Sequence, residues 1–282
     1  MPPTLDLLLP WNVSPTVLVA ITLAAVLYLR GMNRTLPPVP YPRRIAYLSG
    51  LALIYAALQT RWEYFASHMF FVLQLQHFTL HDLGPVLLAL GAPGAALARG
   101  LPKRVQAHLP AAARVLLGPR RFLKDPVAAV AVYFLTQLIW FLPPFAFDAM
   151  ISNWVYRLMS WSIVLGGMPF WHLILDARSY PSSRLRLRYR FVMIYIAMLP
   201  MMLIAAALAF SQSDWYPVYA VCGRFLPISP VSDQQLSGMA MGIPGQLLFG
   251  MVLFLVLGRR LERGYAPRAS ILAEEKPRES TR

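Results

Sequence analysis

The residues of this chain best suited to chemistry lie close together, in an apolar run within its first third. His77 and His81 are four residues apart, so on a helix their imidazoles project from one face, about one turn apart. Two imidazoles at this spacing can bind one metal ion, and imidazole suits copper, zinc, iron and nickel. Histidines inside a membrane can also simply hydrogen-bond neighbouring helices. The pair therefore indicates either a metal site or a structural polar contact.

The elements that must hold these residues are transmembrane helices. Hydrophobic residues make up 57% of the 282 residues, charged residues only 13%, and the mean hydropathy is +0.52. A bilayer core of about 30 Å needs roughly 20 apolar residues per helix. The sequence therefore predicts an all-α integral membrane protein with seven transmembrane helices, near residues 13–30, 45–62, 64–84, 127–147, 153–175, 190–211 and 235–258.

The basic residues predict how these helices are oriented. The segments after the first, third, fifth and seventh runs are rich in arginine, whereas the other segments hold almost no Lys or Arg. Because basic loops stay in the cytoplasm, the N-terminus is expected outside and the C-terminus in the cytoplasm. We expect residues 1–258 to form the membrane domain, in contact with lipid. Residues 259–282 are expected to be a basic, polar cytoplasmic tail without fixed structure.

The same composition excludes several classes of function. The net charge of +14, from 26 Lys and Arg against 12 Asp and Glu, is explained by topology, and no nucleic-acid recognition motif accompanies it. The single cysteine rules out a disulfide within the chain and a CxxC pair. Because topology explains the charge, we expect no nucleic-acid partner. No Walker, HExxH or GxSxG motif occurs, so we also expect no enzyme activity.

Within the third run, the polar residues are spread in depth. His68 comes nine residues before His77, about 13.5 Å along a helix. Because this run is expected to pass from outside to inside, His68 and Met69 should lie near the outer surface. His77 should then lie at mid-depth, with His81 and Asp82 deeper.

Two separated motifs resemble a known family. The stretch HMFFVLQLQHFTLHDLGPVLLALGAP, His68 to Pro93, resembles the third-span block of the multi-span, CtaG-like cytochrome c oxidase assembly factors. DQQLSGMAMGIPG, Asp233 to Gly245, resembles the block that opens their last span. The likeness runs from about Ile45 to Leu257. It departs from the family at Leu73, where another histidine is frequent, and at Gly242, where tryptophan is common.

The resemblance implies a role in maturing a haem–copper oxidase in the bacterial inner membrane, by binding copper and assisting its delivery on the outer side. An oxidase subunit is then the expected partner and copper the expected ligand. The resemblance and the ligand chemistry together assign a metal site, and Asp233, Met239 and Asp82 are further outer-side candidates. The expected metal ligands are His77, His81, His68 and Met69.

Two other functions use the same histidines. A transporter of copper or of another small solute would have them along its pathway, although no inverted repeat is evident. A haem-binding membrane protein would use His77 or His81 with His172 as axial ligands. His172 is expected near the inner end of its span, which makes that pairing awkward for a histidine at mid-depth.

Overall fold

The computed structural model describes residues 13–106, 125–176 and 185–274, and throughout these ranges every regular element is a helix. The expectation of an all-α protein is therefore confirmed. The elements are α2 (Pro15–Gly31), α3 (Tyr41–Gln59), α4 (Trp62–His68), α5 (Phe70–Phe78), the π-helix η1 (Thr79–Leu83), α6 (Gly84–Leu90), α7 (Gly94–Gly100), α10 (Pro126–Phe141), α11 (Pro143–Ile151), α12 (Asn153–Ile174), α13 (Leu187–Phe210), α14 (Val218–Cys222) and α15 (Pro230–Glu274).

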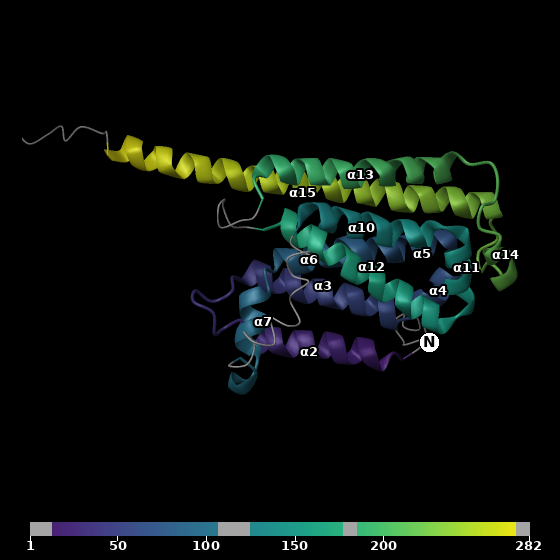
Figure 1. Ribbon diagram of the computed structural model, residues 1–282, viewed down its shortest axis with the longest axis horizontal. Coiled ribbons are helices and arrows are strands. Elements are labelled where there is room, and N and C mark those ends of the chain that lie inside the picture. Colours follow the sequence, from purple (N-terminus) through teal and green to yellow (C-terminus); the bar gives the residue numbers. More distant parts are fainter. Residues whose placement is uncertain (1–12, 107–124, 177–184, 275–282) are drawn as a thin grey trace, which may run out of the picture.

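The long helices lie side by side along one common direction (Figure 1). α13 packs along α15, and α15 packs on α5, while α3 packs on α6 and α10 on α12. α2 lies at one side of the bundle against α7. The segment formed by α5, η1 and α6 is thus enclosed by helices from several parts of the chain, which is why its polar residues are buried.

Two helices of the described ranges are long and apolar enough to cross a membrane alone, Leu187–Phe210 and Pro230–Arg259. Two bent pairs raise the number to four if each pair is one span. The first joins Phe70–Leu90 to Gly94–Gly100 at 76°, and the second joins Pro126–Phe141 to Pro143–Ile151 at 73°. The count of seven spans stays a prediction.

The third apolar run does not form the single helix expected over residues 64–84. It is interrupted at Met69, whose extended backbone (φ −141°, ψ 123°) separates α4 from α5. Pro85 follows the π-turn of η1 and lies at the start of α6, where a missing N–H is tolerated. The sharp bend comes later, beside Ala92 at φ 45°.

The last helix also extends further than expected. α15 continues to Glu274, past the boundary at residue 258 where a polar tail was expected to begin. Its final part projects beyond the other helices in Figure 1. The leucines, arginines and glutamates after Gly258 are good helix formers, which favours this continuation. The rest of the expected tail, residues 275–282, lies outside the described residues.

Candidate functional site

A small cavity lies in the middle of the bundle, where η1 and α5 face α10, α13 and α15. Its free volume of about 20 Å³ is enough for one water molecule or one metal ion. Polar and apolar side chains share its wall. The lining residues are Gln74, Phe78, His81, Asp82, Tyr133, Gln137, Met201, Met241, Gly245, Gln246 and Phe249.

Asp82 is held in this wall by two hydrogen bonds. Its Oδ1 accepts from the Tyr133 hydroxyl at 2.6 Å and from the Trp171 indole Nε1 at 3.1 Å. A carboxylate in a membrane interior is costly unless it is paired or hydrogen-bonded. The two donors therefore fix the carboxylate and leave its negative charge at the edge of the cavity.

His81 occupies the π-turn beside Asp82, and its ring packs on Tyr133 with centroids 4.1 Å apart. Its Nε2 lies 3.5 Å from the Thr136 hydroxyl. Its Nδ1 lies 3.7 Å from Asp82 Oδ1, which is too far for a hydrogen bond, and it has no hydrogen-bond partner in the part of the chain that the structure describes. The ring is thus positioned by packing, and one nitrogen is available to a ligand.

Among the described residues, several other buried polar atoms also lack a hydrogen-bond partner. They are the Oε1 atoms of Gln74 and Gln137, which line the cavity, and both ring nitrogens of His77, which is not one of its lining residues. By contrast, Gln76 is satisfied, because its amide donates to Ala57 O at 2.6 Å and its Oε1 accepts from the Tyr156 hydroxyl at 2.6 Å. Leaving a buried polar group unpaired costs about 1–3 kcal/mol. The unpaired atoms are therefore the ones that indicate a ligand.

The structure does not bring all of the expected metal residues to this cavity. His68 lies in α4, where its Nδ1 is 2.7 Å from Tyr64 O, and Met69 is fully buried at the break before α5. The Met239 side chain is 45% exposed, whereas Met241 lines the cavity. Among the described residues, no group of three or more His, Cys, Asp and Glu side chains is arranged to hold a metal ion.

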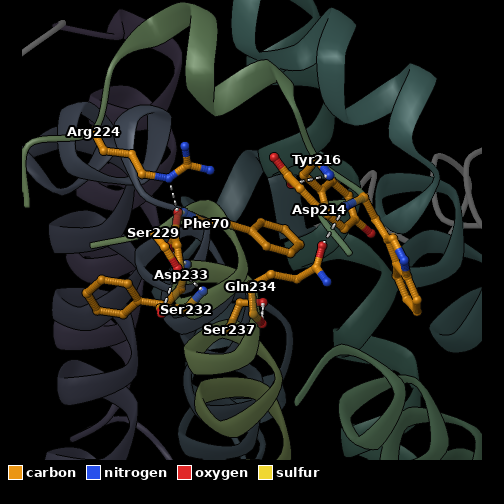
Figure 2. Close-up of polar contacts among 11 residues, drawn as sticks. Phe70, Asp214, Tyr216, Arg224, Ser229, Ser232, Asp233, Gln234 and Ser237 are labelled. Carbon is orange, nitrogen blue, oxygen red and sulfur yellow. Dashed lines mark hydrogen bonds and ion pairs between the residues drawn. The ribbon is translucent and has the colours of Figure 1, made fainter. Parts of the chain in front are cut away.

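A second polar cluster joins the start of α5 to the start of α15, and Asp233 is its centre (Figure 2). Asp233 is fully buried, and its two carboxylate oxygens accept from the backbone N–H groups of Phe70 and Phe71, each at 3.1 Å. The Arg224 Nε donates to Asp233 Oδ2 at 3.1 Å. The break at Met69 exposes the first N–H groups of α5, and Asp233 satisfies two of them.

Gln234 and Gln235 hold the segment between α13 and α15 in place. Gln234 accepts from the backbone N–H of Trp215 at 2.8 Å and donates to Ser213 O at 2.9 Å. Gln235 donates to Ser211 O at 3.0 Å. The hydrogen bonds found for Asp233, Gln234 and Gln235 therefore connect α5, α15 and this loop, and in this structure the Asp233 carboxylate is already engaged.

Glu63, in α4 and outside the candidate spans, makes stability depend on pH. Burial raises the pKa of Glu63 from 4.5 to about 7, and the nearby Arg157 guanidinium partly offsets this effect. The stabilisation is fully present below about pH 4.5 and is lost as the pH rises through 7, because the folded state holds the proton more tightly. We expect a higher melting temperature in detergent at pH 5 than at pH 8, and a smaller difference in Glu63→Gln. An unchanged difference in that variant would contradict this role.

Several residues of the cavity were not expected from the sequence. Gln137 is a polar residue within an apolar run, which is a usable signal of function or of interhelical contact. Met201 and Met241 carry no such signal, because 13 methionines are spread along the chain and most methionines only pack. Only the packing of α13 and α15 shows which of them reach the cavity.

Apolar helices long enough to cross a bilayer, packed around a small polar cavity, define a helical membrane protein. A sequence model of the cytochrome c oxidase caa3 assembly factor family (Caa3_CtaG) matches residues 25–263. The chain belongs to this family, which confirms the expectation from its two motifs.

The chain is also similar to two curated proteins from mycobacteria. They are the uncharacterized protein Mb0105 of Mycobacterium bovis and the uncharacterized protein MT0111 of Mycobacterium tuberculosis. Each is 29% identical over 184 residues, which cover 61% of this chain and 28% of the relative. The chain thus matches little more than a quarter of each relative's length. No solved structure matches this chain.

Proposed function

We propose that this protein binds copper and assists its delivery to a haem–copper cytochrome c oxidase, without catalysing a reaction itself. Membership of the oxidase assembly factor family supports the oxidase as the partner. The observation that carries the copper proposal is His77, which is buried and whose two ring nitrogens have no hydrogen-bond partner among the described residues, together with the Nδ1 of His81, which also has none there. Copper bound to these nitrogens would supply the interactions that the protein leaves unmade.

We further propose a seven-span arrangement in the bacterial inner membrane, with the N-terminus outside and the C-terminus in the cytoplasm. The alternation of arginine-rich segments supports it. α2 and α15 begin at the same end of the bundle, and α15 ends at the opposite end (Figure 1). The cluster around Asp233 then lies at the outer end, where an oxidase subunit that receives copper would dock.

In this arrangement, copper enters from the outer end and passes along the third apolar run. His68 and Met69 lie at the junction of α4 and α5, closest to the Asp233 cluster. His77 and His81 follow at increasing depth. His68 and Met69 are proposed as transient contacts, because the ring of His68 already faces Tyr64 O and Met69 is fully buried.

The test is copper analysis of protein purified in detergent from copper-fed cells. The wild-type protein should retain stoichiometric copper and show no haem band, whereas His77→Ala/His81→Ala should lose the copper. His172→Gln is a matched control, because His172 is an exposed histidine on α12 that does not line the cavity. Copper in the double variant equal to that in the wild type would overturn the assignment of these two ligands.

A second measurement tests delivery. Cells that lack this protein should assemble oxidase with less copper and lower activity, and the wild-type gene should restore both. His77→Ala/His81→Ala should accumulate in the membrane but fail to restore the copper content. Full restoration by this variant would show that the protein serves the oxidase without carrying copper.

A further inference from the structure

We propose that the central cavity holds the copper as Cu(I), with the thioethers of Met201 and Met241 as ligands beside His81 Nδ1. This inference rests on the proposed function, because it names the oxidation state and the ligands of the copper that the protein carries. It assigns roles to Met201 on α13 and Met241 on α15, two methionines that carry no other signal of function in the sequence.

The two proposed ligands are buried, whereas the methionines next to them on the same helices are exposed. On α13, Met201 is 7% exposed and lines the cavity, whereas Met202 is 40% exposed. On α15, Met241 is 9% exposed and lines the cavity, whereas Met239 is 45% exposed. α13 and α15 pack along each other, so the two buried methionines approach one cavity from adjacent helices.

Unpaired polar atoms make this cavity more than a packing gap. Within the described ranges, His81 Nδ1 is buried without a hydrogen-bond partner, and the same is true of Gln74 Oε1 and Gln137 Oε1. All three side chains line the cavity. The free volume of about 20 Å³ admits one ion.

The chemistry of the wall favours a soft, singly charged ion. Thioethers select Cu(I), and imidazole binds copper well. The absence of any three-membered His, Cys, Asp and Glu group from the described ranges disfavours the ligand sets typical of structural zinc. Asp82 Oδ1 already accepts from Tyr133 and Trp171, so its carboxylate balances one positive charge without needing to be a ligand.

The experiment is an anaerobic titration of the full-length protein in detergent with Cu(I), in competition with a chromogenic Cu(I) chelator. Met201→Leu/Met241→Leu should weaken Cu(I) binding by at least about tenfold, as expected when copper loses two soft ligands. Leucine nearly conserves the volume of methionine, so packing should be preserved. The matched control Met202→Leu/Met251→Leu changes exposed methionines of the same two helices that do not line the cavity, and it should bind within about twofold of the wild type.

X-ray absorption at the copper edge of the wild-type complex gives an independent readout that needs no variant. Sulfur in the first coordination shell, lost in Met201→Leu/Met241→Leu, would support the proposal. Cu(I) bound only by nitrogen and oxygen, with equal affinity in this variant and abolished by His77→Ala/His81→Ala, would overturn the thioether site and leave the proposed function standing. A wild-type protein that binds no Cu(I) would overturn both.

Discussion

Replacing Asp233 by asparagine is expected to destabilise the folded protein by about 3–5 kcal/mol, the usual effect of removing one partner of a buried ion pair. The carboxylate is fully buried and accepts from two backbone N–H groups of α5 and from Arg224. An asparagine amide has one acceptor oxygen in place of two. Its NH2 group is itself a donor and would face a backbone N–H of α5 or the Arg224 guanidinium without forming a hydrogen bond. Arg224, whose side chain is only 10% exposed, would lose its counterion.

The melting temperature and the denaturant midpoint in detergent measure this effect. Asp214→Asn is the matched control, because among the described residues Asp214 Oδ1 accepts one hydrogen bond, from the backbone N–H of Tyr216 at 2.9 Å, and the change should cost about 1 kcal/mol. Arg224→Gln should also destabilise, and the double variant should be less destabilised than the sum of the two changes, because the residues are directly coupled. An Asp233→Asn protein as stable as Asp214→Asn would show that the cluster does not hold α5 and α15 together.

Replacing Gly167 by alanine is expected to displace the π-turn and with it His81. Gly167 lies on α12, and a Cβ atom there would overlap the backbone carbonyl oxygen of His81. Because the obstacle is backbone, no side-chain rotation relieves it, and α12 must separate from η1. We expect a loss of about 1–3 kcal/mol in stability, typical of overpacking, together with a marked loss of copper retention.

Gly250→Ala provides the control for this variant. Gly250 is on α15 and no atom lies within 4 Å of a Cβ built there, so alanine should be neutral or stabilise the helix by up to about 1 kcal/mol. Thermal unfolding and copper analysis of the two variants, purified in parallel, make the comparison. If Gly167→Ala kept the stability and the copper of the wild type, contact between α12 and η1 would not be what positions His81.

The two blocks that resemble the family show how much of the fold and the site the residue pattern alone predicts. Their motifs predicted the family, and the helical spacing predicted that His77, His81 and Asp82 lie within an apolar helix. Asp233, a further outer-side candidate for the metal site, contacts the first turn of α5. Its role differs from the one suggested, because the carboxylate satisfies backbone donors that appear only when the helix breaks at Met69.

The π-turn is a feature that spacing rules could not predict. The pattern from His77 to His81 fits an ordinary α-helix. The surrounding helices leave room for the π-turn over Thr79–Leu83. The lack of a Cβ atom at Gly167 leaves space for the His81 carbonyl oxygen. Tyr133 and Trp171 donate hydrogen bonds to Asp82. Tyr133 belongs to α10, and Gly167 and Trp171 belong to α12. All three residues therefore lie more than fifty positions after Asp82 in the sequence.

The sequence by itself determined the membrane character, the helical class and the family. Apolar content, charge distribution and short motifs are all properties of residues that are neighbours in the sequence. Tertiary structure alone decided which side chains meet in the cavity. Met201 and Met202 are adjacent on one helix, and only the packing of α13 against α15 leaves Met201 buried and Met202 exposed. Two methionines have the same hydrophobicity, so residue type cannot predict which of them is buried. Contact between helices depends instead on the direction in which each side chain points where the helices cross.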